Sequence, residues 1–219
     1  MEGLDQLGGT LVFLLAGGWV LWLIGGTLIN RRRAASIGRW VYREVRPYGG
    51  KLAIRWLTLA AFELTVSEAR KPFRQLTLVG FLESREMPFV WLWNRLRRRG
   101  DLLVVRAELR RLPRWGLEAY RAHSVAADDA RRTAQAAGWT SQQGADGIWR
   151  ANGGGAAAER SDRLLAALGP YAARVERLAV HGEAPQLTVV LSLRGLSPDD
   201  APPLGRWLAD VAEVAVSEP

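Results

Sequence analysis

The feature that most constrains this chain is a stretch of 23 residues, Leu7–Ile29, that contains no charged side chain. As an α-helix it would be about 35 Å long, at about 1.5 Å per residue. A bilayer has a hydrocarbon core about 30 Å thick, and it offers no water to the backbone, so a crossing segment must satisfy its own hydrogen bonds as a helix. The stretch therefore predicts a transmembrane helix over residues 7–29, after a short N-terminal tail, residues 1–6.

The charges on either side of this stretch predict its orientation. Glu2 and Asp5 precede it, whereas Arg31, Arg32 and Arg33 follow it at once. Lys and Arg residues beside a membrane span stay on the cytoplasmic side. We therefore expect a single-pass protein of the cell membrane, with its N-terminus outside and the rest of the chain in the cytoplasm. The alternative is a cleaved signal peptide, but that would carry its basic residues before a shorter apolar segment.

The membrane stretch is also rich in glycine. Small residues let two helices approach closely in lipid, so these glycines indicate a surface for packing against another membrane protein or a second copy of the chain. The alternative interpretation is the ordinary glycine content of membrane helices. The candidate packing residues are Gly17, Gly18, Gly25 and Gly26.

Residues 30–50 are predicted to form a basic juxtamembrane helix or linker. Ile37, Trp40, Val41 and Val45 recur at helical spacing. Two structures fit this pattern: a short amphipathic helix that lies on the membrane, or a stalk that continues the membrane helix. The candidate lipid-contact residues in this region are Arg31, Arg32, Arg33, Arg39, Trp40 and Arg43.

The net charge of +8 is concentrated in one part of the chain. Residues 31–121 carry 21 Lys and Arg against 8 Asp and Glu, whereas residues 122–219 carry 9 against 12. We interpret the basic part as the part nearest the membrane, where anionic headgroups attract Lys and Arg by about 1 kcal/mol per residue. A basic surface also suits nucleic acid, but lipid is the simpler partner because the anchor already holds the chain there.

The segment 51–66 leaves three structures open: a strand, an interfacial helix or a second membrane span. Arg55 and Glu63 lie within it, and the apolar run between them is only seven residues long. Because a span needs about 20 apolar residues, we favour a buried or interfacial strand or helix that leads into the folded domain.

The remainder of residues 51–122 indicates an antiparallel β-rich part. Apolar and β-branched residues form short runs, one of which alternates with charged residues, and turn signals separate them. Strands joined by such short turns favour a meander. The expected strands are Leu76–Leu82, Met87–Trp93, Asp101–Arg111 and Trp115–Ala122.

The C-terminal part, residues 123–219, mixes helix and strand patterns. Helices are expected to start at Asp128, at Ser161 and at Ser197-Pro198-Asp199-Asp200, since these residues suit the N-terminal cap and first turn. The fold class is therefore α+β, with an N-terminal transmembrane helix, an antiparallel β-meander and a β/α C-terminal part. Its expected strands are Ile148–Arg150, Val175–Val180 and Gln186–Ser192, and its candidate hinge is Gly153–Gly155.

No residue pattern indicates catalysis or metal binding. The chain has no cysteine, which removes thiol nucleophiles and cysteine metal sites, and His123 and His181 lack metal-ligand spacing. The acid pairs Asp128-Asp129 and Asp199-Asp200 stand where helices are expected to begin, and the helix dipole favours acids there. We therefore predict no catalytic residue, no metal and no cofactor, and we expect a protein that is not an enzyme.

One aromatic and basic segment is a candidate surface for lipid or for a partner protein. Tryptophan rings lie at headgroup depth and arginines bind lipid phosphates; the same combination can stack on and neutralise nucleic acid, which we disfavour. The interpretation we favour is that the tryptophans simply pack in the core or in the membrane. The residues are Trp91, Trp93, Arg97, Arg98 and Arg99.

Three stretches, Gln75–Trp93, Asp101–Gly116 and Val175–Leu193, follow one another in an order found in a set of uncharacterised bacterial proteins. The chain resembles these single-pass, membrane-anchored proteins with a cytoplasmic α+β domain. In that set an acid-rich turn precedes a helix after the strands, and Asp128-Asp129 matches it. The resemblance implies this architecture and no particular chemistry.

These inferences favour a membrane-anchored, non-enzymatic interaction or scaffold protein, or an accessory subunit of a membrane complex. Its expected partners are the lipid bilayer and either another membrane protein or a second copy. One alternative is an anionic-lipid-binding or sensing domain that uses the basic aromatic surface. The other is an enzyme of unknown chemistry, whose acid and base would meet only in the folded structure.

Overall fold

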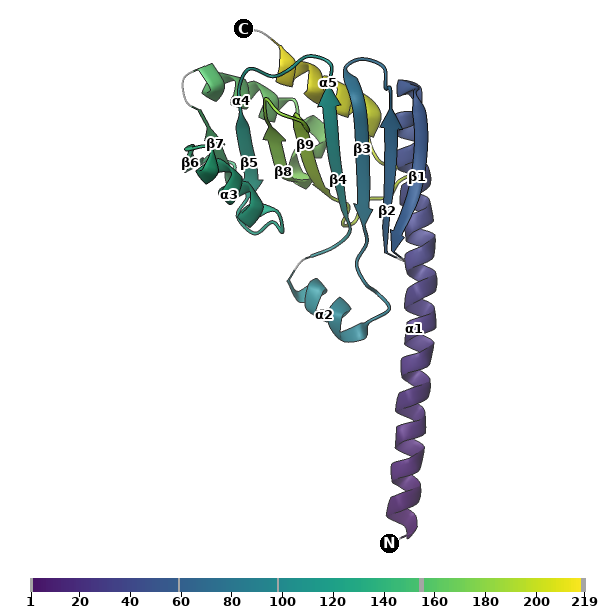
Figure 1. The fold of residues 1–219 in the computed structure, drawn as a ribbon. Helices are drawn as coiled ribbons and strands as arrows, with labels where there is room; N and C mark the ends of the chain where they lie inside the picture. Colours follow the sequence, from purple (N-terminus) through teal and green to yellow (C-terminus); the bar gives the residue numbers. More distant parts are fainter. Residues whose placement is uncertain (1, 59, 98, 154–155, 218–219) are drawn as a thin grey trace.

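The computed structural model describes residues 2–58, 60–97, 99–153 and 156–217, leaving aside the side chains of residues 2–8 and 156. A nine-stranded sheet packs against helices, and one long helix, α1 (Glu2–Val45), projects from it and carries the N-terminus at its free end (Figure 1). Every pair of neighbouring strands is antiparallel. The α+β class predicted from the sequence is confirmed.

The remaining elements alternate along the chain. The strands are β1 (Lys51–Thr58), β2 (Ala61–Ser67), β3 (Phe73–Phe81), β4 (Leu102–Leu109), β5 (Leu117–Arg121), β6 (Thr140–Gln143), β7 (Ile148–Asn152), β8 (Val175–Val180) and β9 (Leu187–Ser192). The helices are α2 (Pro88–Leu96), α3 (Ala127–Ala136), α4 (Ala156–Ala166) and α5 (Leu204–Val216), with short 3-10 helices η1 (Arg46–Tyr48) and η2 (Gly169–Arg174).

The order of the strands joins both halves of the chain in one sheet. That order is β1-β2-β3-β4-β9-β8-β5-β7-β6. The predicted meander runs from β1 to β4 and stops there, because β9 and β8 lie between β4 and β5. The expectation that the strand at Trp115–Ala122 continues the meander is therefore wrong, and this strand pairs instead with β8 and β7.

The segment 51–66 forms β1 and most of β2, a hairpin rather than a helix or a second span. Arg55 and Glu63, the two charges that interrupt its apolar sequence, lie directly opposite each other and pair at 3.2 Å. Opposite charges at facing positions stabilise an antiparallel pair.

The expected membrane segment and the juxtamembrane segment form a single unbroken helix, α1, which agrees with a continuation of the first segment and not with a separate surface helix. The apolar stripe of residues 30–45 is buried against β2, β3 and α5 rather than against lipid. Ile37, Trp40 and Val41 are each at most 2% exposed, whereas Arg39 and Arg43 stay exposed on the other side of the helix. Trp40 is therefore a core residue and not a lipid contact.

The main core lies on the face of the sheet covered by α1, α4 and α5 (Figure 1). Alternate residues of β4 show the two-residue period of a strand: Leu103, Val105 and Ala107 are fully buried, and Arg106 between them is exposed. On the opposite face α3 packs on β5 and β8.

The expected strand Met87–Trp93 is wrong, because these residues enter helix α2. A short apolar run does not distinguish a strand from a helix by periodicity. Pro88 lies at the start of α2, where its missing N–H and fixed φ are compatible with the first helical turn.

Three expected helix starts differ from the structure. Ser161 lies inside α4, where its hydroxyl donates to the carbonyl of Ala157 at 2.7 Å. Helix α3 begins at Ala127, with Asp128 and Asp129 in its first turn, where neither side chain forms the cap. Helix α5 begins only at Leu204, directly after consecutive prolines, which disfavour a helix that passes through them. Of the candidate hinge only Gly153 lies within the described residues.

Candidate membrane interface

The N-terminal half of α1 exposes a continuous apolar surface. Every described side chain from Thr10 to Trp22 is exposed, including Phe13 at 84% and Leu21 at 72%. Among the described residues α1 is the one helix that is long and apolar enough to cross a membrane. The predicted membrane segment is thus present as a helix, and its described side chains are exposed over most of its length.

Helix α2 lies beside α1 rather than against the sheet (Figure 1). The ring of Phe89 is 5.8 Å from that of Trp19, and the ring of Trp91 is 5.7 Å from that of Trp22. The indole N–H of Trp22 also donates to the carbonyl of Arg85, in the loop before α2, at 3.0 Å. These contacts fix α2 at the level of the C-terminal half of the apolar stretch.

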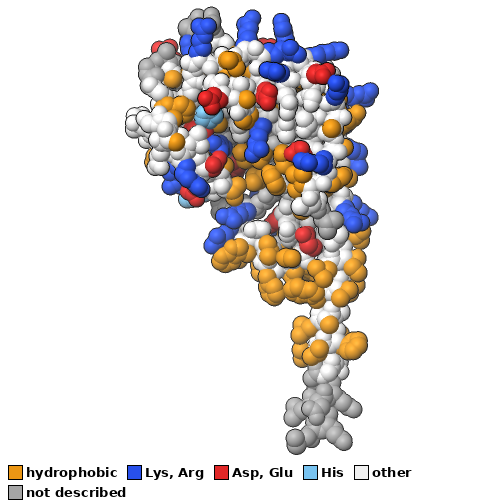
Figure 2. All heavy atoms as spheres, viewed as in Figure 1, with side chains coloured by type: hydrophobic (Ala, Val, Ile, Leu, Met, Phe, Trp, Pro, Cys, Tyr) orange, Lys and Arg blue, Asp and Glu red, His pale blue; other side chains and the backbone are white. Residues whose placement is uncertain are grey.

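The surface of α2 is apolar and remains uncovered. None of its residues is buried, and Figure 2 shows the hydrophobic side chains gathered over α2 and the adjoining part of α1. An exposed patch of this kind marks an interaction or membrane site in a soluble domain. The exposed apolar residues are Met87, just before α2, and Phe89, Val90, Leu92, Trp93 and Leu96, between 42% and 74% exposed.

Arginines gather at the C-terminal end of this apolar helix. The guanidinium of Arg97 lies 4.2 Å from the ring centre of Trp93, and that of Arg95 lies 5.6 Å from that of Trp91, both as cation–π contacts. Arg99 is exposed just beyond them. The structure thus gathers the predicted tryptophans and arginines on one helix and its end, with Arg98 outside the described residues.

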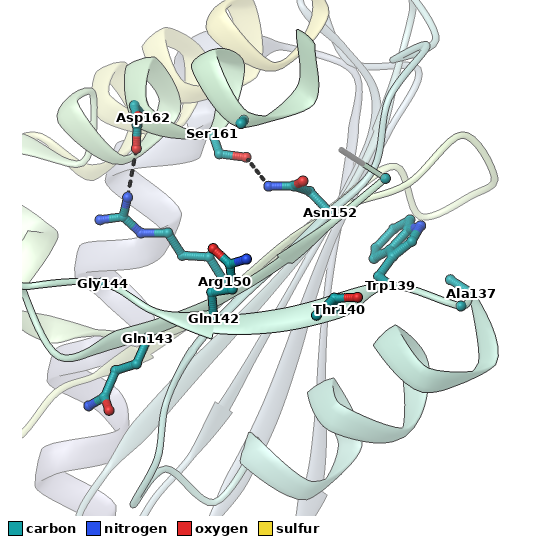
Figure 3. A pocket seen from close by; sticks show the side chains of 13 residues that line it. Ala137, Trp139, Thr140, Gln142, Gln143, Gly144, Arg150, Asn152, Ser161 and Asp162 are labelled. Carbon is teal, nitrogen blue, oxygen red and sulfur yellow. Dashed lines mark hydrogen bonds and ion pairs between the residues drawn. The ribbon is translucent and has the colours of Figure 1, made fainter. Parts of the chain in front are cut away.

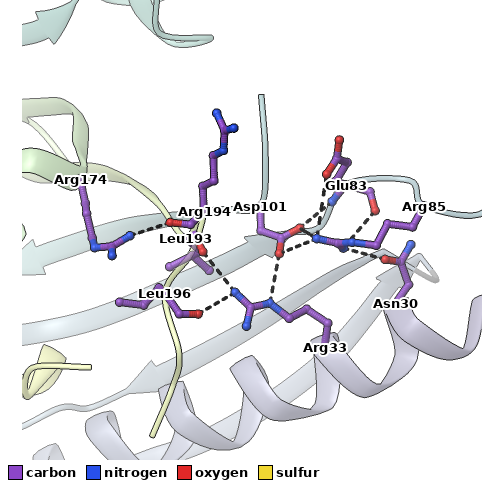
Figure 4. A network of polar contacts seen from close by, with 9 residues as sticks. All are labelled: Asn30, Arg33, Glu83, Arg85, Asp101, Arg174, Leu193, Arg194 and Leu196. Carbon is purple, nitrogen blue, oxygen red and sulfur yellow. Dashed lines mark hydrogen bonds and ion pairs between the residues drawn. The ribbon is translucent and has the colours of Figure 1, made fainter. Parts of the chain in front are cut away.

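A buried carboxylate, Asp101, ties α1 to the start of β4 (Figure 4). It is 2% exposed. It accepts from Arg33 Nε at 3.2 Å, from Arg85 Nη2 at 3.0 and 3.1 Å, and from the backbone N–H of Glu83 at 2.9 Å. Burial raises the pKa of Glu83, against the opposing effect of Arg85. Arg33 is therefore part of an internal ion-pair network, whereas Arg31 and Arg32 remain exposed.

The same network reaches the loop before α2 through Asn30, which is 2% exposed. Its amide donates to Glu86 at 2.6 Å and its oxygen accepts from Arg85 at 2.8 Å. Arg33 extends the network in the other direction, with Nη2 donating to the carbonyls of Leu193 and Leu196. Four separate parts of the chain are thereby held together where α1 meets the domain.

Gly26 is the one candidate packing glycine that this structure uses for a contact. A Cβ at Gly26 would lie 2.5 Å from the carbonyl oxygen of Arg85 and 2.7 Å from the Cα of Glu86, so only glycine admits the loop before α2. At Gly17, Gly18 and Gly25 a Cβ would meet nothing within 4 Å. Those three positions stay open to another molecule.

Gly26→Ala is expected to destabilise the packing of α2 on α1 by about 2 kcal/mol, since the clash is with backbone and no rotamer relieves it. The melting temperature, measured by tryptophan fluorescence in detergent, should fall by about 4–8 °C. Gly18→Ala is the matched control and should leave it unchanged. Equal melting temperatures for the two variants would contradict this account of Gly26.

Several other basic residues of segment 31–121 lie at the end of the sheet opposite this interface. Loops β2–β3 and β4–β5 are at the opposite end of the sheet from α2, and Figure 2 shows Lys and Arg gathered there. The interpretation that the whole basic part lies nearest the membrane is therefore wrong, because antiparallel strands carry alternate loops to opposite ends. The exposed residues of these two loops include Arg70, Lys71, Arg111 and Arg114.

A polar cavity of about 760 Å³ lies between β6, β7 and α4 (Figure 3). Arg150 in its wall already pairs with Asp146 and Asp162, each at 2.6 Å. Asn152 donates to the hydroxyl of Ser161 at 3.4 Å. Among the described side chains of this cavity, the hydroxyl of Ser161 donates to the carbonyl of Ala157 and the carboxylate of Asp162 pairs with Arg150, so the two do not form a nucleophile–base pair.

A second buried charge cluster joins β5, β8 and α3. Glu118 is fully buried and accepts from Arg177 at 2.7 and 2.9 Å and contacts His181 Nε2 at 2.9 Å. Asp129 pairs with the same arginine, and Trp139 stacks on His181. Burial would lower the pKa of Arg177, but its bonds to both acids raise it. Glu118 carried no recognisable sequence signal, because its partners lie about 60 residues away.

Among the described residues no group of three acids or histidines is placed to hold a metal ion. No protein-family model and no curated protein sequence matches this chain. The most developed surface feature of the described residues is the apolar surface of α1 and α2, with arginines at the C-terminal end of α2.

Proposed function

We propose that this protein is a membrane-anchored, non-enzymatic scaffold or accessory subunit that holds its α+β domain at a fixed height on the cytoplasmic face of the cell membrane. The observation that carries the proposal is the division of α1: one half is apolar and exposed, and the other half is part of the domain core. A helix shared in this way allows no flexible linker between membrane and domain.

The contacts of α1 support a definite depth in the bilayer. The polar loop at Arg85 and Glu86 meets the helix at Gly26, which marks the headgroup level. Between Asp5 and Gly26 lie 20 residues, about 30 Å of helix, equal to the hydrocarbon thickness. The proposed span therefore ends near Gly26, before the apolar stretch itself ends at Ile29.

This depth puts α2 at the membrane surface. Trp19 lies seven residues before Gly26, about 10 Å further into the bilayer. Amphipathic interfacial helices bury their apolar face about 5–10 Å below the headgroups. The rings of Phe89 and Trp91 that contact α1 would then lie at the top of the acyl chains, with Arg95 and Arg97 among the phosphates.

The open glycine positions are the proposed contact with a membrane partner. Gly18 and Gly25 are seven residues apart and therefore share a face of α1, and nothing described covers it. Close approach at such small residues drives helix association in lipid. The partner is either another membrane protein or a second copy of this chain.

A photo-crosslinking residue at Gly18 in native membranes is expected to give an adduct with a protein. The matched control is Val20, two residues on and about 200° around the helix, which should give lipid adducts alone. A protein adduct at twice the mass of the chain identifies a second copy. Lipid adducts alone from both positions would exclude the helix-mediated scaffold.

An anionic-lipid-binding domain is the second candidate function. The specific observation in its favour is the apolar helix α2 with arginines stacked on its tryptophans. Both functions require α2 in the bilayer, and they differ in whether lipid or protein is the ligand.

A further inference from the structure

A cavity of about 850 Å³ opens at the membrane-facing end of the domain, between the C-terminal end of α2 and the loop from β5 to α3. The excursion that carries α2 leaves β3 and returns to β4 at this end of the sheet, and Ser192, opposite Leu102, lines the cavity from β9. The cavity is therefore next to the helix that the proposed function puts at the bilayer surface.

The wall of this cavity is basic. Arg97 and Arg99 come from the end of α2, Arg121 from β5, and His123 from the following loop, and Glu176 is the single acid in the described lining. Arg121 donates to the carbonyls of Ala172 and Val175, which fixes its position.

The two arginines from the end of α2 are exposed. Arg97 is oriented by its contact with the ring of Trp93. Neither Arg97 nor Arg99 forms an ion pair with another described residue. Both residues line the cavity, and their guanidinium donors are not used in an ion pair with a described acid, as expected of a site for an anion.

The same cavity has an apolar margin. Leu96 is 71% exposed and Val125 is 49% exposed, and both line it. An inorganic anion needs no such margin and would fill a small part of the volume. A ligand that joins a phosphate to a hydrocarbon chain fits both parts, because the phosphate meets the arginines and the chain passes over Leu96.

We propose that this cavity binds the phosphate-bearing headgroup of an anionic phospholipid, with one acyl chain leading over Leu96 into the bilayer. The proposal rests on the proposed membrane position of α2 and names the ligand of that surface. Basic pockets on the cytoplasmic side of membrane proteins recognise such headgroups. Bound lipid would close the gap between α2 and the domain and stabilise the position of the helix.

The test uses the full chain in nanodiscs of phosphatidylcholine with a minority of phosphatidylglycerol. Lipid retention is measured by native mass spectrometry as protein is released from the disc. Wild type is expected to retain phosphatidylglycerol selectively. Arg97→Gln with Arg99→Gln should weaken that selective retention by about 30-fold, the effect of two headgroup-bound cations. Arg70→Gln with Lys71→Gln removes the same charge at the far end of the sheet and should change nothing.

Other results would overturn the proposal. Equal retention of both lipids by wild type would exclude a headgroup site. Saturable binding of soluble glycerol phosphate in discs of pure phosphatidylcholine, as tight as the lipid, would assign the cavity to a soluble phosphate compound. If the control Arg70→Gln with Lys71→Gln weakens the selective retention of phosphatidylglycerol as much, the effect comes from net charge and not from this cavity.

Labelling of a Leu92→Cys variant with a water-soluble maleimide shows whether the headgroup site alone fails or the membrane position of α2 fails with it. If this thiol is labelled slowly but wild type retains no phosphatidylglycerol selectively, the headgroup site is excluded and α2 remains in the membrane. Fast labelling removes α2 from the bilayer, which excludes the headgroup site and the proposed depth of the domain but leaves α1 as the anchor.

Discussion

Asp101→Asn is expected to destabilise the folded domain by about 3 kcal/mol. The substitution keeps the size of the side chain and removes its charge, so Arg33 and Arg85 lose the carboxylate that both of them contact. Breaking a buried ion pair by removing one partner typically costs 3–5 kcal/mol. We expect the lower end because both arginines keep some exposure, 26% and 21% of their side chains.

The measurement is thermal unfolding of the full chain in detergent, where the midpoint should fall by about 6–12 °C. Asp128→Asn is the matched control: its carboxylate pairs with Arg131 but is 78% exposed, and exposed pairs contribute about 0–1 kcal/mol. If the two variants unfold at the same temperature, the Asp101 network does not hold α1 to the domain.

A cysteine introduced at Phe89 or Leu92 is expected to react about 100-fold more slowly with a water-soluble maleimide in liposomes than a cysteine at Gln135. The thiolate is the reactive form, and an apolar environment raises a thiol pKa by two units or more. All three positions lie on helices and are exposed. They differ in that the first two belong to the apolar surface of α2 and Gln135 belongs to α3, beyond the proposed membrane.

The chain suits this experiment because it has no cysteine of its own. Detergent should remove the difference in rate, since it replaces the bilayer by a mobile micelle. Labelling of the Gln135 cysteine in inverted vesicles but not in spheroplasts would agree with a cytoplasmic domain. Equal rates for α2 and α3 in liposomes would show that α2 lies in water.

In the α2 segment the sequence predicts the chemistry of the surface but not its secondary structure. Trp91, Trp93 and Arg97 were recognisable as a candidate surface from their chemistry alone. Their secondary structure was not, because the seven apolar residues Met87–Trp93 are compatible with a strand or a helix. In the structure this segment is a helix. Its Phe89 and Trp91 contact two tryptophans of α1 that lie more than 65 residues away in the chain.

The sequence by itself determined the apolar helix at the N-terminus, the α+β class and most strands, since these depend on the composition and spacing of neighbouring residues. The tertiary structure decided the rest. It inserted β8 and β9 beside β4, buried Trp40, drew Arg33 into an internal ion-pair network, and carried half of the basic loops to the far end of the sheet. These outcomes depend on pairing between distant segments, and local periodicity carries no information about which strands become neighbours.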